Sequence, residues 1–350
     1  MRLRRSDCSD PGLTRRRHGK GFQFLDEHGD PIDDDETLTR IRELVIPPAW
    51  RDVWICPVPT GHIQATGFDD RGRKQYLYHP RWRERRDQAK FDDMLAFARG
   101  LPALREEIDR ELGRRPLDRN RVLAAAVRLL DRGFFRIGSE EYAAENRSYG
   151  LATMRKEHVV QRGDTIVFDF PAKSGKRRVQ AIVDPEVAAV VRSLKRRRGG
   201  GEELLAYKVS SGWRDVHSED INAWLRERAG REITAKDFRT WGATVLAAVA
   251  LAVSGRASNS QTARKRAITR AVKEVAGYLG NTPAVARASY IDPRVIDRFH
   301  DGLTIGAGLE RLGADPGDPA IQGAVEAAVL DLIEGHESSS VAGAAEALAA

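Results

Sequence analysis

The sequence predicts an α+β fold, in which a small β-rich N-terminal domain precedes a larger, mainly α-helical domain that contains a small antiparallel sheet. Up to about Tyr78, apolar runs are short and are separated by glycine and proline. Beyond it, apolar residues recur at helical spacing, apart from a group of alternating segments between about His158 and Val183. The length of 350 residues is enough for two or three domains that each bury a core. We therefore expect a β-rich domain with a basic connecting segment at residues 1–86, a helical domain at residues 87–312 and an acidic, alanine-rich tail at residues 313–350.

Four short strands are predicted in the N-terminal domain, each flanked by turn residues. They cover residues 22–24, 53–56, 62–65 and 75–78. Two acidic runs, residues 33–36 and 69–70, fall in turn-like contexts and are interpreted as solvated loop charges. The very basic segment at residues 79–86 should connect the strands to the first helix of the second domain.

A helix is predicted after Asp118, which suits an N-cap, because apolar residues then repeat at helical spacing. These residues are Leu123, Val127, Leu130 and Phe134, and Gly133 weakens the end of the helix. Strands should follow at residues 158–160, 165–170 and 178–183, the last two on either side of a tight turn at residues 173–176. Together they predict a three-stranded antiparallel sheet.

From Asp184 onward the pattern is helical again, and the basic, glycine-rich stretch at residues 195–201 is interpreted as a solvated loop. Thr234 and Asp237 form a capping-box pattern at the start of one helix, and a second helix, rich in Arg and Lys, is expected at about residues 260–277. Thr282 and Pro283 suit the cap and first turn of a short helix that Pro293 should end. The end of the chain, from about residue 320, predicts a weak helix or disorder.

Composition is that of a soluble globular protein, with 41% hydrophobic and 31% charged residues. No apolar stretch reaches the roughly 18 residues of a membrane span, and the basic start of the chain leads into no apolar signal core. Cys8 and Cys56 are too few for a disulfide framework, and their spacing from the histidines fits no zinc site. We expect reduced thiols, a cytoplasmic location and no membrane association.

The net charge of +7 understates the basicity of most of the chain. Residues 313–350 contain seven acids and no Lys or Arg, so residues 1–312 carry +14. This asymmetry favours a polyanionic partner for the body of the protein, with the tail outside the contact.

The common signatures of nucleotide and metal chemistry are missing from the sequence. There is no Gly-x-x-x-x-Gly-Lys phosphate loop, no His-Glu-x-x-His and no spaced set of acids for two metals. The sequence therefore predicts no cofactor, no bound metal and no nucleotide.

Four ordered segments of basic, hydroxyl and amide residues carry a family resemblance. They are Phe-Phe-Arg-Ile-Gly at residues 134–138, the hairpin lysine Lys173, Lys-Asp-Phe-Arg-Thr-Trp-Gly at residues 236–242, and Gly-Asn-Thr-Pro at residues 280–283 followed by Ala-Ser-Tyr at residues 288–290. In this order they resemble the active-site segments of type IB DNA topoisomerases, in the compact form of poxviruses and bacteria. The likeness extends over roughly Gly19 to Asp301 and includes residues 72–79, which resemble the DNA-contacting strand of that family.

The resemblance implies a clamp around duplex DNA that cuts one strand through a 3′-phosphotyrosyl bond, lets the free end rotate and reseals it without ATP. It implies an enzyme that works as a monomer in the cytoplasm, at the nucleoid. The catalytic residues that it assigns are Arg136, Lys173, Arg239, Asn281 and Tyr290. The residue types suit the reaction, because without a metal only cationic and hydrogen-bonding side chains can balance the charge that develops on the phosphate.

Within that scheme Tyr290 is the nucleophile, and Lys173 protonates the departing 5′ oxygen, with Lys176 as a rival three residues away. Seven residues of helix separate Pro283 from Tyr290, a rise of about 10.5 Å, and the phenol should lean back toward Asn281. Many members of the family have histidine at the Asn281 position. Asparagine donates a hydrogen bond but brings no positive charge, which predicts a slower reaction rather than a different one.

DNA-contact positions implied by the resemblance are Gln75, Tyr76, Tyr78, Tyr142 and Lys236. Strand alternation places Gln75 on one face and the two tyrosines on the other, so either the strand twists at an edge or only one set touches DNA. The residues leave that question open.

Two other functions are compatible with parts of the sequence. A tyrosine site-specific recombinase shares the two arginines, the lysine and the tyrosine, but normally has histidine three residues before the second arginine, where Lys236 stands here. A non-catalytic DNA-binding clamp is suggested only by Asn281, against the retention of the other four catalytic residues.

Overall fold

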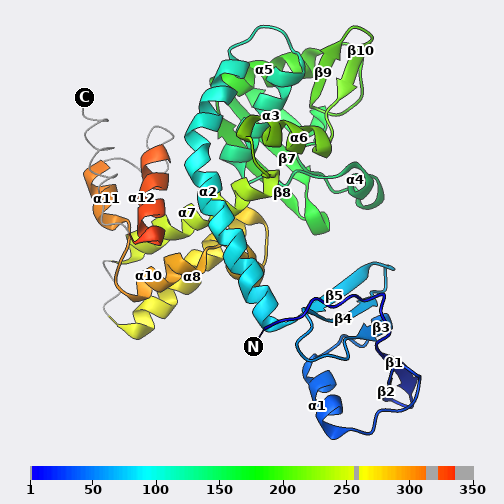
Figure 1. Ribbon diagram of the computed structural model, residues 1–350. Helices are drawn as coiled ribbons and strands as arrows, with labels where there is room; N and C mark the ends of the chain where they lie inside the picture. Colours follow the sequence, from blue (N-terminus) through cyan, green and yellow to red (C-terminus); the bar gives the residue numbers. More distant parts are fainter. Residues whose placement is uncertain (1, 256–259, 313–321, 336–350) are drawn as a thin grey trace. The chain divides into compact units, whose positions relative to one another are not determined.

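A computed structural model describes residues 2–255, 260–312 and 322–335 of the chain. Contacts within it divide the chain into two units, Met1–Asp92 and Asp93–Ala350 (Figure 1). Of the strands that the structure describes, five lie in the first unit and five in the second, which also holds most of the helices, so the predicted α+β class is confirmed.

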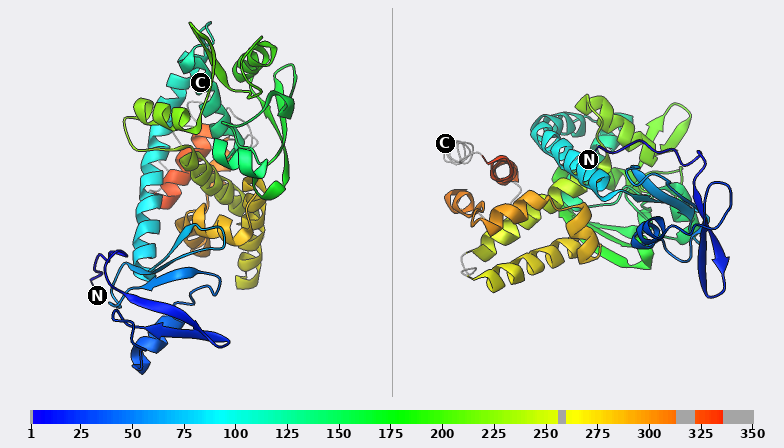
Figure 2. Two further views of the ribbon diagram at one scale, coloured as in Figure 1. Left: turned by 90° about the vertical axis from the view of Figure 1, so that its right-hand side faces the viewer. Right: turned by 60° about the horizontal axis from the view of Figure 1, so that its bottom comes forward.

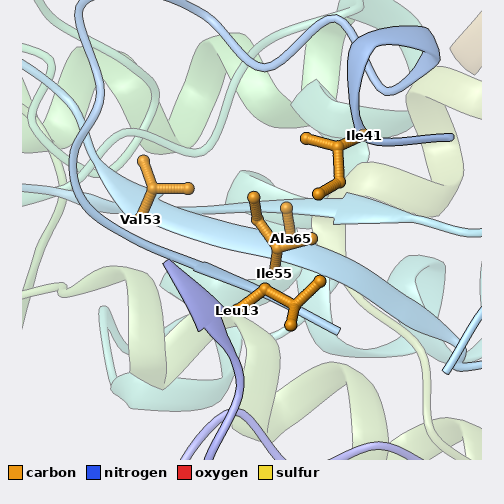
Figure 3. Close-up of a cluster of buried hydrophobic side chains, with 5 residues drawn as sticks. All are labelled: Leu13, Ile41, Val53, Ile55 and Ala65. Atoms are coloured by element: carbon orange, nitrogen blue, oxygen red, sulfur yellow. The ribbon is translucent and has the colours of Figure 1, made fainter. Parts of the chain in front are cut away.

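The N-terminal unit is built on a five-stranded antiparallel sheet in the order β2-β1-β3-β4-β5. Its strands are β1 (Leu13–His18), β2 (Gly21–Leu25), β3 (Arg51–Ile55), β4 (Ile63–Phe68) and β5 (Lys74–Tyr78). Figure 3 shows its core, where Ile41 of helix α1 (Asp35–Glu43) faces apolar side chains of the sheet. Those side chains are Leu13, Val53, Ile55 and Ala65.

Two elements of this unit, strand β1 and helix α1, were not predicted from the sequence. β1 carries Arg15, Arg16 and Arg17 and has no apolar alternation, because only its first residue, Leu13, is buried.

The acidic run at residues 33–36, interpreted as a solvated loop, instead begins α1. The side chain of Asp34 accepts the Thr37 N–H at 2.8 Å, and acids in a first turn stabilise the positive end of the helix dipole.

The expected connector at residues 79–86 is not a linker, because the chain is helical from Pro80. α2 (Pro80–Leu112) is 33 residues long, and proline at its start costs no hydrogen bond. The N–H groups of Trp82 and Arg83 bond to the carbonyl of His79 at 2.9 and 3.1 Å, so the basic residues form the first turns of this helix.

In the second unit α3 (Arg119–Gly133) is the central helix, with every residue from Val122 to Leu130 buried. Asp118 caps it by accepting the Arg121 N–H at 3.0 Å, as predicted. The other long helices are α5 (Pro185–Arg196), α6 (Ser218–Ala229), α7 (Ala235–Gly255) and α8 (Gln261–Leu279). Figures 1 and 2 show α7 and α8 side by side, and α3 packs against α5, α6 and α7.

The remaining elements are short. They are α4 (Glu140–Asn146), the 3₁₀ turns η1 (Lys156–His158) and η2 (Lys173–Gly175), α9 (Pro283–Ser289), α10 (Pro293–His300) and α11 (Gly306–Leu312), together with the strands β6 (Val159–Arg162), β7 (Thr165–Pro171), β8 (Arg177–Val183), β9 (Ala206–Val209) and β10 (Gly212–Asp215). The order β6-β7-β8, antiparallel throughout, confirms the predicted three-stranded sheet, while the β9–β10 hairpin was not predicted.

Two sequence interpretations in this unit were wrong. Pro293 does not end α9; it begins α10 with Asp292 as the N-cap, since a proline at a first helical position needs no N–H partner. The stretch at residues 195–201 is not wholly solvated either. The Arg197 side chain is buried and donates hydrogen bonds to the carbonyls of Leu194 and Leu204 at 3.2 and 2.8 Å, which ties the loop to the body.

α12 (Gln322–Glu334) accounts for part of the predicted weak C-terminal helix. It is not a detached tail, because Val325, Val329 and Ile333 are buried and Glu326 forms an ion pair with Arg105 at 2.7 Å. Residues 313–321 and 336–350 of the predicted tail lie outside the described residues. Among the helices of the described ranges, none is long and apolar enough to cross a membrane.

Candidate active site

The segment that carries Arg136 follows directly from the end of α3. Gly133 closes the helix where a side chain would collide with the ring of Phe135, and Phe134 takes the left-handed conformation at φ 49°. Backbone bonds then fix the next residues, because the carbonyl of Arg136 accepts the Leu151 N–H at 2.8 Å. The Arg136 backbone is therefore held on a rigid helix end.

Lys173 lies at the tip of the β7–β8 hairpin, as the sequence predicted. The turn is closed by bonds between Ala172 and Lys176 at 2.8 Å and between Gly175 and Ala172 at 3.0 Å. Ser174 and Gly175 both have φ near 69°, and the five residues 172–176 connect the two strands. The side chain of Lys173 is exposed and lines the cavity described below.

The first turns of α7 supply Lys236 and Arg239. One half of the predicted capping box is present, because Asp237 accepts the Thr234 N–H at 2.7 Å, while the Thr234 hydroxyl donates to the same carboxylate at 3.1 Å. Lys236 is exposed, whereas Arg239 is buried, with 3% of its surface exposed. Burial lowers the pKa of Arg239 to about 10, and the charge of Arg136 acts in the same direction, so Arg239 stays charged at neutral pH.

Asn281 and Tyr290 stand at the two ends of α9. Thr282 caps this helix as predicted, by accepting the Val285 N–H at 3.3 Å. Tyr290 is the residue just after the helix, not a member of its last turn. Its carbonyl accepts the hydroxyl of the buried Thr244 at 3.2 Å, and the same oxygen of Thr244 accepts the Asp292 N–H at 3.1 Å. Thr244 thereby ties the tyrosine backbone to α7.

The Arg239 guanidinium lies over the Tyr290 ring, 5.4 Å from its centroid. Burial by itself raises the pKa of Tyr290, but the charges of Arg239, Arg136 and Lys236 outweigh burial and bring that pKa below the ordinary value of tyrosine. A phenol in this position is easier to deprotonate than a free tyrosine.

Arg136 also fixes the orientation of the Asn281 amide. Its Nη2 donates to Asn281 Oδ1 and, at 3.3 Å, to the carbonyl of Gly280. The other end of the amide, Nδ2, is buried and has no hydrogen-bond partner among the described residues. A buried N–H group without an acceptor is costly, so Nδ2 is an unsatisfied donor beside the Arg136 guanidinium.

Six of the predicted site residues line one cavity of about 390 Å³: Arg136, Tyr142, Lys173, Lys236, Arg239 and Tyr290. A neighbouring cavity of about 810 Å³ shares Arg136 and Lys173 with the first and adds Asn281 and Lys176. The five predicted catalytic side chains are thus gathered about one region, and the rival lysine Lys176 lines only the second cavity.

Gln75, Tyr76 and Tyr78 belong to the N-terminal unit, on the edge strand β5. Strand alternation holds, because Leu77 packs on the core while the tyrosine rings are 40% and 38% exposed and stacked 6.0 Å apart. Gln75 donates to Asp69 at 2.9 Å. Of the two faces, the one with the tyrosines is open to solvent.

Two residues near the site, Arg178 and Thr244, were missed by the sequence analysis. Thr244 is an internal helix residue without a motif, and Arg178 is one of two adjacent arginines at the start of its strand. Only the tertiary structure brings them to the site. Within the described ranges, no group of three or more His, Cys, Asp or Glu is placed to hold a metal ion.

Comparison with known proteins places these residues in a family. Residues 79–303 match the family described as eukaryotic DNA topoisomerase I, catalytic core, and residues 21–69 match the bacterial DNA topoisomerase IB N-terminal domain. A DNA topoisomerase 1B of Acanthamoeba polyphaga mimivirus is 31% identical over 297 residues, which cover 80% of this chain and 85% of the viral protein.

More distant relatives come from poxviruses. The DNA topoisomerase 1B of Vaccinia virus (strain Western Reserve) is 24% identical over 67% of this chain and 72% of its own length, and the DNA topoisomerase 1 of Rabbit fibroma virus (strain Kasza) is 24% identical over 68% and 73%. The family match covers well over half of the chain and includes all five predicted catalytic residues. The chain belongs to the type IB DNA topoisomerases, enzymes that act on duplex DNA.

Proposed function

We propose that Tyr290 cuts one strand of duplex DNA and that the enzyme relaxes supercoils through the resulting covalent bond, with no metal and no nucleotide. The observation that supports this best is the buried Arg239 guanidinium, 5.4 Å from the centre of the Tyr290 ring. The phenolic oxygen attacks phosphorus, a 3′-phosphotyrosyl bond forms and the bond to the 5′ oxygen breaks. Torsion in the DNA turns the free end, and the 5′ hydroxyl then attacks the phosphotyrosine and releases Tyr290.

Arg136, Arg239 and Asn281 would stabilise the phosphate as its charge develops. The two guanidiniums stay protonated and donate from a planar fork that matches phosphate oxygens. Asn281 would use its unpartnered Nδ2. In the absence of a metal, these donors supply the electrostatic stabilisation that phosphoryl transfer needs.

Lys173 is proposed as the general acid that gives a proton to the departing 5′ oxygen. Its place at the tip of a hairpin lets the ammonium reach a strand that lies across the cavity. In the religation step the same amine would take the proton back.

We propose a clamp around DNA whose two domains are residues 1–86 and 87–312. Strand β5 would contact DNA in the first domain and the face around the catalytic cavity in the second, and the end of the chain would lie outside the contact. Tyr76 and Tyr78 would pack on sugar and phosphate. Gln75 would exchange its hydrogen bond to Asp69 for one to a base edge. Tyr142 and Lys236 would contact the backbone near Tyr290. We propose that one copy is sufficient and that it works at the nucleoid, in the cytoplasm.

Family membership does not favour the two alternatives. A recombinase would normally have histidine where Lys236 stands, and a non-catalytic clamp would have no need to keep Tyr290 under a buried arginine.

Relaxation of a supercoiled plasmid in EDTA and without nucleotide tests the proposal. We expect stepwise relaxation and, after denaturation in detergent, protein attached to the 3′ end of the broken strand. A requirement for Mg²⁺ or ATP would refute the metal-free mechanism, attachment to the 5′ end would refute the assigned chemistry, and products joined from two sites would indicate a recombinase.

Asn281 offers a matched pair of substitutions. Asn281→Ala removes one donor and should slow single-turnover cleavage about tenfold, which corresponds to the free energy of about one hydrogen bond. Asn281→Asp keeps the shape and the oxygen that accepts from Arg136, but replaces Nδ2 with a negatively charged oxygen that faces the phosphate. We expect it to be slower than the alanine variant, by about a further tenfold, and an aspartate variant as fast as wild type would show that Nδ2 does not meet the phosphate.

A further inference from the structure

The C-terminal end of α8 holds an unusual concentration of positive charge. The N–H groups of Gly280 and Asn281 turn back to the carbonyls of Gly277 and Ala276, at 3.1 and 3.0 Å. The carbonyls of Tyr278, Leu279 and Gly280 therefore need other donors.

Three arginines from different parts of the chain provide them. Arg178 Nη2 donates to the Tyr278 carbonyl and Arg239 Nη2 to the Leu279 carbonyl, both at 2.9 Å. Arg136 Nη2 donates to the Gly280 carbonyl at 3.3 Å. The negative end of the helix dipole offsets part of the repulsion between these cations.

Arg178 and Arg239 also reach the end of a second helix. Arg178 Nη2 lies 3.4 Å from the carbonyl of Gly133, the last residue of α3, and Arg239 Nη1 donates to the carbonyl of Phe134. Two guanidiniums thus bridge the same pair of helix ends. Beyond the end of α3 the chain leads to Arg136, and beyond the end of α8 it leads to Asn281.

Arg178 is itself held in a single position. Its Nε and Nη2 donate to Gln180 Oε1 at 3.2 and 3.0 Å, and Gln180 Nε2 donates to the same Gly133 carbonyl. Burial and, to a smaller extent, the charge of Arg136 lower the pKa of Arg178 to about 10, so the side chain is charged at neutral pH. These contacts of Nε and Nη2, in a largely buried setting, hold the side chain against both helix ends.

From this geometry we infer that Arg178 is a positioning residue, which sets the spacing between the ends of α3 and α8 so that Arg136 and Asn281 meet one phosphate. The inference rests on the proposed roles of those two residues. Arg239 cannot set the spacing of the two helix ends alone, because its guanidinium must also contact Tyr290 and the DNA phosphate. A third arginine that bridges the same two helix ends leaves Arg239 available for the reaction.

The test compares Arg178→Gln, Arg178→Lys and the exposed control Arg162→Gln, which lies in strand β6 of the same sheet. Single-turnover cleavage and religation are measured on a DNA oligonucleotide, and binding is measured with each substitution placed in Tyr290→Phe. We expect Arg178→Gln to slow both steps about 10- to 100-fold, the cost of a misplacement of about 1 Å, with binding within about threefold. Lysine keeps the charge but lacks the fork, so Arg178→Lys should stay at least about tenfold below wild type, and the control should match wild type.

A double-mutant cycle separates positioning from general loss of structure. If Arg178 acts by placing Asn281 and its neighbour Arg136, then Arg178→Gln should slow the Asn281→Ala variant at least about threefold less than it slows wild type. Three outcomes would each overturn the inference. The two substitutions could reduce the rate by independent factors, Arg178→Lys could cleave as fast as wild type, or Arg178→Gln could cleave within about twofold of wild type. Rates are normalised to the fraction of folded enzyme from a thermal melt. Wild type and Tyr290→Phe in the same assay report separately on the proposed function, since its failure would appear in those two samples.

Discussion

Tyr290→Phe should bind supercoiled DNA as wild type does and relax none of it, a loss on the order of 10⁴-fold or more. The substitution removes one oxygen from a residue whose backbone is held by Thr244 and whose ring lies under Arg239. Ring, packing and the charges around it all remain, so only the nucleophile is lost. Plasmid relaxation on agarose gels, with enzyme in excess over plasmid, is the measurement.

A second tyrosine serves as the control for this result. Tyr278 is 52% exposed at the end of α8, and the Tyr278→Phe variant should relax DNA normally, because its contact with Arg178 is made by the backbone carbonyl. Measurable relaxation by Tyr290→Phe, or a covalent DNA adduct at another residue, would contradict the assignment of Tyr290.

Arg239→Gln should slow single-turnover cleavage about 10²- to 10³-fold, the cost of one strong donor to a developing charge. The side chain that is lost is buried, charged and placed over the nucleophile. Arg239→Lys keeps a charge without the planar fork, so its cleavage rate should lie between the rates of Arg239→Gln and wild type. DNA affinity, measured in the Tyr290→Phe background, should change little, because Arg239 is one cation among many.

The same variant should change the pH dependence of cleavage. Arg239 lowers the pKa of Tyr290, so its removal raises that pKa, and the pH at which cleavage reaches its plateau should move upward. The exposed Arg192→Gln on α5 serves as the control and should leave both rate and profile unchanged. A loss of less than about tenfold for Arg239→Gln would show that another group supplies the main charge.

The fold class and the set of chemical groups were readable from the sequence because they depend on local patterns. Helical spacing after Asp118, alternation in the β6-β7-β8 strands, and the caps at Thr234 and Thr282 each involve a few neighbouring residues. β1 was missed because it has no apolar alternation, and α1 because it is nine residues long and has only two apolar residues, Leu38 and Ile41, after an acidic run.

The roles of residues within the site needed more than pattern. The family resemblance selected Arg136, Lys173, Arg239, Asn281 and Tyr290, and the structure gathers them about adjoining cavities. No sequence feature indicated that the Asn281 amide is oriented by Arg136 or that Thr244 anchors the tyrosine backbone.

Sequence by itself determined which residues can do chemistry here: two arginines, a lysine, an amide and a phenol, in an order typical of one family. The tertiary structure alone decided how the ends of α3 and α8 approach each other and which arginines fill their free carbonyls. The physical reason is that a helix end leaves its last carbonyls without partners, and the donors that satisfy them come from wherever packing places a side chain. Arg178 lies 100 residues from the Tyr278 carbonyl that it binds, a contact that no local pattern encodes.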